Sequence, residues 1–158
     1  MKWFIKCLRH YADFSGRARR KEYWMFMLFS MITAIVIGVL MILVFMLTKN
    51  HYYNELIPYG LSEEQVRAVQ IGNLNYMKAI YNVSSIVYLS YSIIMILPSM
   101  AVAVRRLHDI GKSGWMLLVS LIPIVGEIWL LVLMVIDSQT GENQYGINPK
   151  NNKLIIEN

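Results

Sequence analysis

Three long stretches with almost no charged side chain dominate the pattern of hydrophobic and polar positions. Residues 23–48 and 83–104 contain no charged residue, and residues 115–136 contain only Glu127. Each stretch is about 22 to 26 residues long, and a helix of that length, rising 1.5 Å per residue, crosses the roughly 30 Å hydrocarbon core of a bilayer. The pattern therefore predicts an all-α integral membrane protein, a single helical bundle with three transmembrane helices.

The basic residues predict how this bundle is oriented. They are dense in the segments 1–22 and 105–114, and sparse in the connection 49–82 and the tail 137–158. Since Lys and Arg in short segments next to a span stay on the cytoplasmic side, we expect the N-terminus in the cytoplasm and the connection outside. Three crossings would place the tail outside as well.

Two short helices are expected outside the spans. Apolar side chains recur at helical spacing near the N-terminus, which is typical of an amphipathic helix lying on the inner membrane surface. These side chains are Trp3, Phe4, Cys7, Leu8 and Tyr11. In the connection, Ser62 and Gln65 form a capping box. It predicts a helix from Ser62 to about Ile71 that ends near Gly72 and Asn73.

The second span carries its polar side chains on one face. They return every three or four residues, as Tyr81, Ser84, Ser85, Tyr88, Tyr91, Ser92 and Ser99. A stripe of small and hydroxyl side chains favours packing against another helix, through close contact and interhelical hydrogen bonds. A polar lining for a substrate path is the alternative that the stripe leaves open.

Glu127 is the single charge inside a predicted span, where an ionised carboxylate costs at least about 2–3 kcal/mol. One solution is a carboxyl held by hydrogen bonds to the polar stripe, with Tyr88 and Tyr91, which would suit proton or cation handling. The other is a re-entrant hairpin turning at Pro123, Gly126 and Glu127, which would return the tail to the cytoplasm. We expect the single span.

Composition agrees with a membrane protein and weighs against several other classes. The chain is 56% hydrophobic and 16% charged, with a mean hydropathy of +0.44. Its net charge of +5 could suit nucleic acid, but the basic residues lie beside apolar spans, where anionic lipid is the simpler partner. Cys7 and His10 have no recognisable metal-ligand spacing with His108 and Asp109, so we expect no metal. Since no residue pattern amounts to a catalytic signature, we also expect no cofactor and no enzymatic activity.

The link 105–114 is the densest polar motif. Residues 111–113 imitate the end of a phosphate-binding loop, but the upstream glycine is absent and an apolar helix stands where a strand is required. We therefore reject nucleotide binding. We expect the two arginines of the link at the lipid headgroups, Asp109 paired with a neighbouring cation, and Ser113 capping the third span.

Three motifs, taken in order, resemble a known bacterial family. They are FSGRARRKEYW at residues 14–24, RRLHD at 105–109 with SGW at 113–115, and GENQYGINP at 141–149. They closely resemble the family called domain of unknown function 805, over nearly the whole chain. The resemblance implies a small multi-spanning protein of the bacterial inner membrane, and it brings no established activity, cofactor or catalytic residue. The long connection and Glu127 depart from the family pattern.

Two classes of function remain. The first is a non-catalytic protein that binds anionic lipid headgroups, or a membrane partner, through a basic cytoplasmic face. Its candidate residues are Arg17, Arg19, Arg20, Lys21, Arg105, Arg106, His108 and Asp109. The alternative is a small transporter or ion-handling subunit that uses Glu127, Tyr88 and Tyr91. Because three helices can hardly enclose a path alone, the alternative requires a homo-oligomer, and we prefer the first class.

Overall fold

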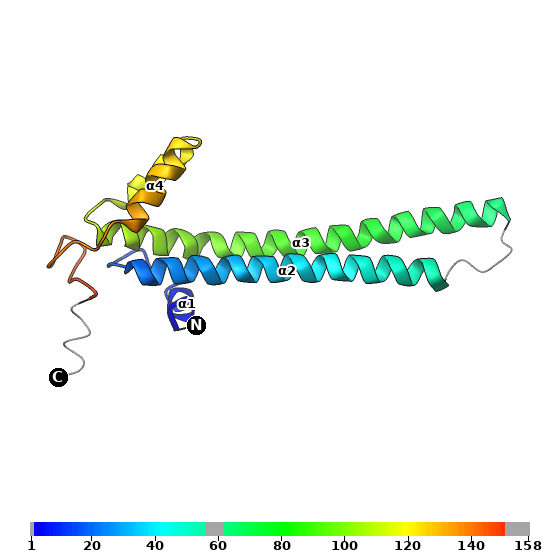
Figure 1. Cartoon of the computed structure of the whole chain (residues 1–158), viewed down its shortest axis with the longest axis horizontal. Helices are drawn as coiled ribbons and strands as arrows, with labels where there is room; N and C mark the ends of the chain where they lie inside the picture. Colours follow the sequence, from blue (N-terminus) through cyan, green and yellow to red (C-terminus); the bar gives the residue numbers. More distant parts are fainter. Residues whose placement is uncertain (1, 56–61, 151–158) are drawn as a thin grey trace. The chain divides into compact units, whose positions relative to one another are not determined.

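The computed structural model describes residues 2–55 and 62–150, and its regular secondary structure there is helical (Figure 1). The elements are α1 (Lys2–Arg9), α2 (Arg20–Glu55), α3 (Glu63–Asp109), the 3-10 helix η1 (Gly114–Leu121) and α4 (Val125–Val135). Within those residues the only strand-like pairing is an isolated bridge between Asn143 and Gly146. The all-α prediction is confirmed.

The chain divides into two compact units, which are described separately. The first combines residues 1–31 with 94–158, and the second comprises residues 32–93. Since the polar motifs of the sequence all fall in the first unit, that unit contains the candidate site. The second unit contains the C-terminal part of α2 and the N-terminal part of α3.

Two of the predicted spans lie in long, apolar helices. α2 has 36 residues and α3 has 47, and both are long and apolar enough to cross a membrane. The capping box at the start of α3 is present, with the Ser62 amide donating to Gln65 Oε1 (3.0 Å) and the Gln65 amide donating to Ser62 Oγ (3.4 Å). The predicted end near Gly72 and Asn73 is wrong, because α3 continues through both residues. A low helix propensity there costs only about 1 kcal/mol, too little to end so long a helix.

The third apolar stretch is a helical hairpin, so the expectation of a single spanning helix is wrong. η1 and α4 are separated by a turn at residues 122–124, and in Figure 1 the chain doubles back from η1 into α4. The two elements touch closely, since a Cβ added to Gly126 would lie 1.8 Å from the Val119 carbonyl oxygen. α4 has 11 residues and is about 16 Å long, which is too short to cross a bilayer.

Local chemistry explains why the hairpin turns where it does. Pro123 has no backbone N–H to continue a helix, and Ile124 adopts a positive φ of 65°, which breaks the helical path. Gly126 then allows the backbones of η1 and α4 to approach. Pro123 and Gly126 belong to the turn that the re-entrant alternative invoked, so a turn inside the third apolar stretch is confirmed, whereas the return of the tail to the cytoplasm stays a prediction. Ser113 caps the start of η1, where its side chain accepts from the Trp115 amide.

The hydrophobic core of the first unit lies where α1, the start of α2, the end of α3 and α4 meet. Its buried members are Cys7, Ala18, Tyr23, Phe26, Val102, Ala103, Leu107, Leu133 and Met134. Phe4 stacks on Phe26 with ring centroids 5.5 Å apart. The helix predicted at the N-terminus is therefore present as α1, and its apolar face packs against α2.

Candidate functional site

Asp109 lies at the centre of a buried network that joins three separate segments of the first unit. Its Oδ1 accepts from Arg17 Nε (3.1 Å), and its Oδ2 accepts from Arg106 Nη1 (2.5 Å) and Ser138 Oγ (2.5 Å). The side chains of Arg17 and Asp109 are 1% and 0% exposed. We call these four residues the arginine network. A buried carboxylate with two cationic partners and a hydroxyl offsets its desolvation cost through short charged hydrogen bonds.

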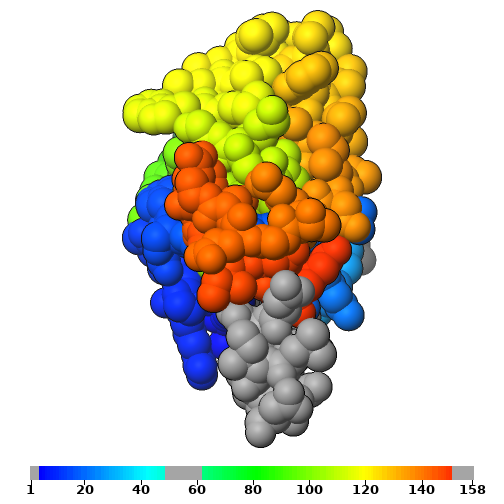
Figure 2. Space-filling model, turned by 90° about the vertical axis from the view of Figure 1, so that its left-hand side faces the viewer, coloured from blue at the N-terminus to red at the C-terminus, as the bar shows by residue number. Residues whose placement is uncertain are grey.

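Arg17 also holds the polar tail that follows α4. Its guanidinium donates to the carbonyl oxygens of Gly141 (2.9 Å), Gly146 (3.1 Å) and Gln139 (2.7 Å). Gly141 and Gly146 both have positive φ, at 75° and 116°, and so turn their carbonyls toward Arg17 in a tight loop. Figure 2 shows this tail, in orange, next to the blue N-terminal segment.

Arg106 closes the C-terminal end of α4. Its guanidinium donates to the carbonyl oxygens of Met134 (3.3 Å) and Ile136, which no turn of helix beyond α4 can satisfy. Burial lowers the pKa of Arg106 below its ordinary value, and the Asp109 carboxylate opposes that shift. A guanidinium stays protonated in proteins, so the end of α4 is capped by a fixed positive charge.

A second buried ion cluster surrounds Glu22 in the first turn of α2. Its side chain is 2% exposed and lies 2.9 Å from Lys6 Nζ and 3.5 Å from Arg105 Nη1. The thiol of Cys7 lies 3.8 Å from Glu22 Oε1. Burial, followed by the Glu22 charge, raises the pKa of Cys7 to about 11. The thiol therefore stays protonated near neutral pH and is a poor nucleophile.

His108 has a structural environment. Its Nδ1 lies 3.2 Å from the Gly16 carbonyl oxygen, and its ring stacks on Tyr145 with centroids 3.7 Å apart. Burial lowers the pKa of His108 below 6.5, although the Gly16 carbonyl opposes this. Within the described ranges, no three His, Cys, Asp or Glu residues lie together as a possible metal site. The imidazole is neutral at pH 7 and links the second motif to the third.

Other basic side chains face outward around a hollow at the start of α2. Arg19, Arg20, Lys21 and Lys150 line this hollow of about 350 Å³, which we call the basic hollow. Two of its cations pair with Asp137, whose Oδ1 lies 2.6 Å from Lys150 Nζ and 3.0 Å from Arg20 Nη2. Ion pairing with Lys150 and the Ser138 amide keep the pKa of Asp137 below its usual value. Within the described part of the chain, the lining thus carries four positive charges and pairs with the carboxylate of Asp137.

A second basic surface lies on α1 and the residue that follows it. Lys6, Arg9 and His10 line a second hollow of about 380 Å³ together with Ile5. Lys6 is already paired with Glu22, so Arg9 is the stronger candidate for contact with an anion there. Of the cations on α1, Lys6 thus reaches back to α2, and Arg9 remains for an external contact.

The structure divides the lipid-contact residues suggested by the sequence. Those that use their polar groups internally are Arg17, Arg105, Arg106, His108 and Asp109; those that line the basic hollow are Arg19, Arg20 and Lys21. Sequence reasoning missed Glu22, Asp137, Ser138 and Lys150. Asp137, Ser138 and Lys150 were missed because a single third span would carry the tail to the opposite membrane face. Pro123, inside the third apolar stretch, was the sequence signal that could have indicated a turn and a returning tail.

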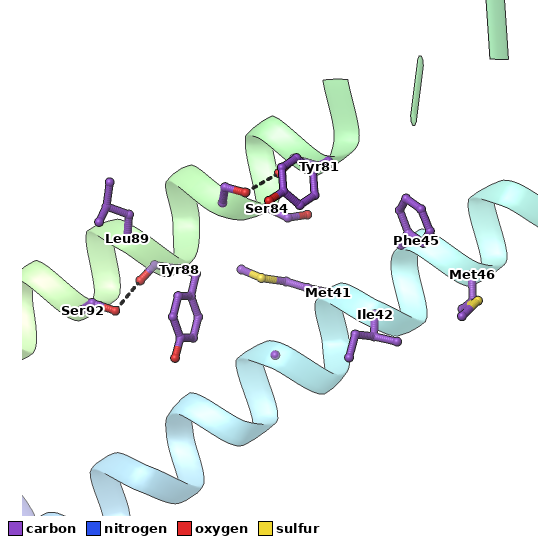
Figure 3. Close-up of a pocket in the computed structure, with 11 residues that line it drawn as sticks. Met41, Ile42, Phe45, Met46, Tyr81, Ser84, Tyr88, Leu89 and Ser92 are labelled. Carbon is purple, nitrogen blue, oxygen red and sulfur yellow. Dashed lines mark hydrogen bonds between the residues drawn. The ribbon is translucent and has the colours of Figure 1, made fainter. Parts of the chain in front are cut away.

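Residues of the alternative site fall in different units. Glu127 is exposed in the first turn of α4, in the first unit, whereas Tyr88 and Tyr91 belong to the second. Tyr88 lines a groove of about 810 Å³ between α2 and α3, and Met41 points toward the facing helix from the other wall (Figure 3). The hydroxyls of Ser85 and Ser92 there donate to carbonyls of their own helix, at 2.8 and 2.9 Å. The groove consequently presents mainly hydrocarbon.

Comparison with known proteins agrees with the motifs. The family model described as "Protein of unknown function (DUF805)" matches residues 11–147. Two relatives from Escherichia coli (strain K12), "Inner membrane protein YhaI" and "Inner membrane protein YhaH", are each 33% identical over 150 residues, which cover 95% of this chain and 97% and 98% of theirs. No solved structure matches the chain. With its two long apolar helices and this near-complete coverage, the chain belongs to the DUF805 family of α-helical membrane proteins.

Proposed function

We propose that this chain is a non-catalytic multi-pass protein of the bacterial inner membrane that binds anionic lipid headgroups at its cytoplasmic face. The observation that carries the proposal is the basic hollow, in which four cations, paired among the described residues with the carboxylate of Asp137, lie beside the first turn of a long apolar helix. Each Lys or Arg near an anionic membrane surface contributes on the order of 1 kcal/mol. Several acting together can retain a headgroup.

The topology that we propose follows from the hairpin and the tail contacts. α2 and α3 cross the membrane, while η1 and α4 enter and leave on one side. The hydrogen bonds from Arg17 to Gly141 and Gly146 support this arrangement, because they require the N-terminal segment and the tail to share one face. That face is basic, so the positive-inside rule assigns it to the cytoplasm.

The buried residues contribute to this function by holding the hollow together. The arginine network fixes the tail against the start of α2, and this contact brings Lys150 beside residues 19–21, far away in the sequence. Without it, the three basic residues at the start of α2 would remain an ordinary topology signal. Arg17 therefore holds the tail in place from inside the protein, while Arg19 is available to contact the headgroup.

Native mass spectrometry of the detergent-extracted chain tests the proposal. Arg19→Gln/Lys21→Gln should retain less phosphatidylglycerol than the parent, while the matched control Arg67→Gln/Lys78→Gln, with both changes on exposed positions of α3, should retain the same amount. A reporter fused after Lys150 should read as cytoplasmic in all three proteins. Equal lipid retention by the two double variants would refute a headgroup site at the basic hollow.

A further inference from the structure

The basic hollow has more positive charge than a singly charged headgroup requires. Among the residues that the structure describes, four cations line it and Asp137 is the carboxylate paired with them, which leaves an excess of three positive charges. Arg19 and Lys21 contribute to this excess without a carboxylate partner in the described contacts, and Arg20 and Lys150 share the single one. A phosphodiester, with one negative charge, would leave most of this excess uncompensated.

We propose that the basic hollow is a site for a phosphomonoester group, such as the headgroup of phosphatidic acid or inorganic phosphate. A phosphomonoester carries about −1.5 to −2 charges at pH 7 and presents three terminal oxygens that accept hydrogen bonds. Arginine binds such oxygens in a bidentate manner, and lysine binds them as a point charge. This inference rests on the proposed function, since it names the ligand of the same site.

The size and construction of the hollow fit a small, highly charged group. Its volume of about 350 Å³ lies at the lower end of the range of ligand sites, which is roughly 300–1,000 Å³. Three cations come from the start of α2, where the helix dipole adds a partial positive charge. The fourth, Lys150, comes from the tail and is held by Asp137 at 2.6 Å and by its own amide, which donates to Asn148 Oδ1 (2.9 Å). The cations thus converge from two segments.

Asp137 acts in this site as an internal counterion, which competes with the ligand for Arg20 and Lys150. Its Oδ1 pairs with Arg20 and Lys150 at once, so both cations are partly neutralised before an anion binds. Removing the carboxylate should therefore strengthen anion binding, although it removes two ion pairs. A residue with a merely structural role would show the opposite sign, because loss of its contacts would loosen the hollow.

The test compares affinities of the detergent-purified full chain for short-chain phosphatidic acid, phosphatidylglycerol, phosphatidylcholine and inorganic phosphate. The parent should bind phosphatidic acid about fivefold more tightly than phosphatidylglycerol, the ratio expected for one additional charge contact. Lys150→Gln should lose this preference and Asp137→Asn should increase it. Lys112→Gln is the matched control, because Lys112 is exposed, lies in the link after α3 and does not line the hollow.

The outcomes separate this inference from the proposed function. Equal affinity for phosphatidic acid and phosphatidylglycerol, both above phosphatidylcholine, would overturn the phosphomonoester site and leave headgroup binding intact. Equal affinity for all three lipids would overturn both. Weaker binding of phosphatidic acid by Asp137→Asn, at an unchanged melting temperature, would overturn the counterion role. Tight binding of phosphatidic acid supports a lipid source, whereas inorganic phosphate binding as tightly as phosphatidic acid supports a soluble phosphate ligand.

Discussion

Replacing Asp109 with Asn tests whether the arginine network holds the first unit together. The amide keeps the size of the side chain but removes the charge that compensates Arg17 and Arg106, both of which are buried. Removing one partner of a buried ion pair typically costs about 3–5 kcal/mol, because the other charge is left uncompensated. Arg17 keeps its carbonyl acceptors in the tail, so we expect a value near the lower end of that range.

Thermal unfolding of the purified chain measures this effect. For a chain of this size, 1 kcal/mol shifts the melting temperature by about 2–4 °C, so Asp109→Asn should lower it by roughly 6–12 °C. Asp13→Asn is the control, because the Asp13 side chain is 41% exposed in its contact with His10, and such surface pairs contribute less than about 1 kcal/mol. A melting temperature for Asp109→Asn within about 2 °C of the parent would refute the assignment of the network as the main tie between the motifs.

Three further substitutions and titrations address the hairpin, the thiol and the imidazole. Gly126→Ala should sharply reduce the yield of folded protein on size-exclusion chromatography, since its Cβ would meet the η1 backbone, whereas Gly38→Ala, with open space around its Cβ, should behave like the parent. Cys7 should react with a maleimide at pH 7.5 only after denaturation, because its pKa is raised to about 11; rapid labelling of the folded chain would contradict its burial. For His108, the lowered native pKa means that the unfolded state binds a proton first as pH falls below about 6.5. Stability measured by thermal unfolding should decline through that window, and the decline should be smaller in His108→Gln.

Long runs without a charged residue determined where the two long helices form. The uncharged runs 23–48 and 83–104 were long enough to require helix formation in a membrane, and no tertiary contact is needed to explain α2 or the apolar part of α3. The capping box at Ser62 and the cap at Ser113 were also readable, because both rest on hydrogen bonds between residues two or three positions apart.

Long-range packing decided the features that sequence reasoning missed. The third apolar run was long enough for one spanning helix, and composition alone could not distinguish one long helix from two short ones. The close approach of Gly126 to Val119 is a contact between η1 and α4, which only the folded chain shows. The roles of the basic residues depended on the same fold. Their charge and position in the sequence predicted a contact with lipid headgroups for both Arg17 and Arg19. In the structure, Arg17 pairs with Asp109 and Arg19 lines the basic hollow.

The sequence by itself thus determined the class of protein, the two long helices and the residue types available at the basic face. Tertiary structure decided which of those residues are buried as internal partners and which remain available for an anion. The physical reason is that a charged side chain far from its partner in the sequence has no local signal of burial. Asp109 and Arg17 are 92 positions apart, and only the folded chain brings them to 3.1 Å.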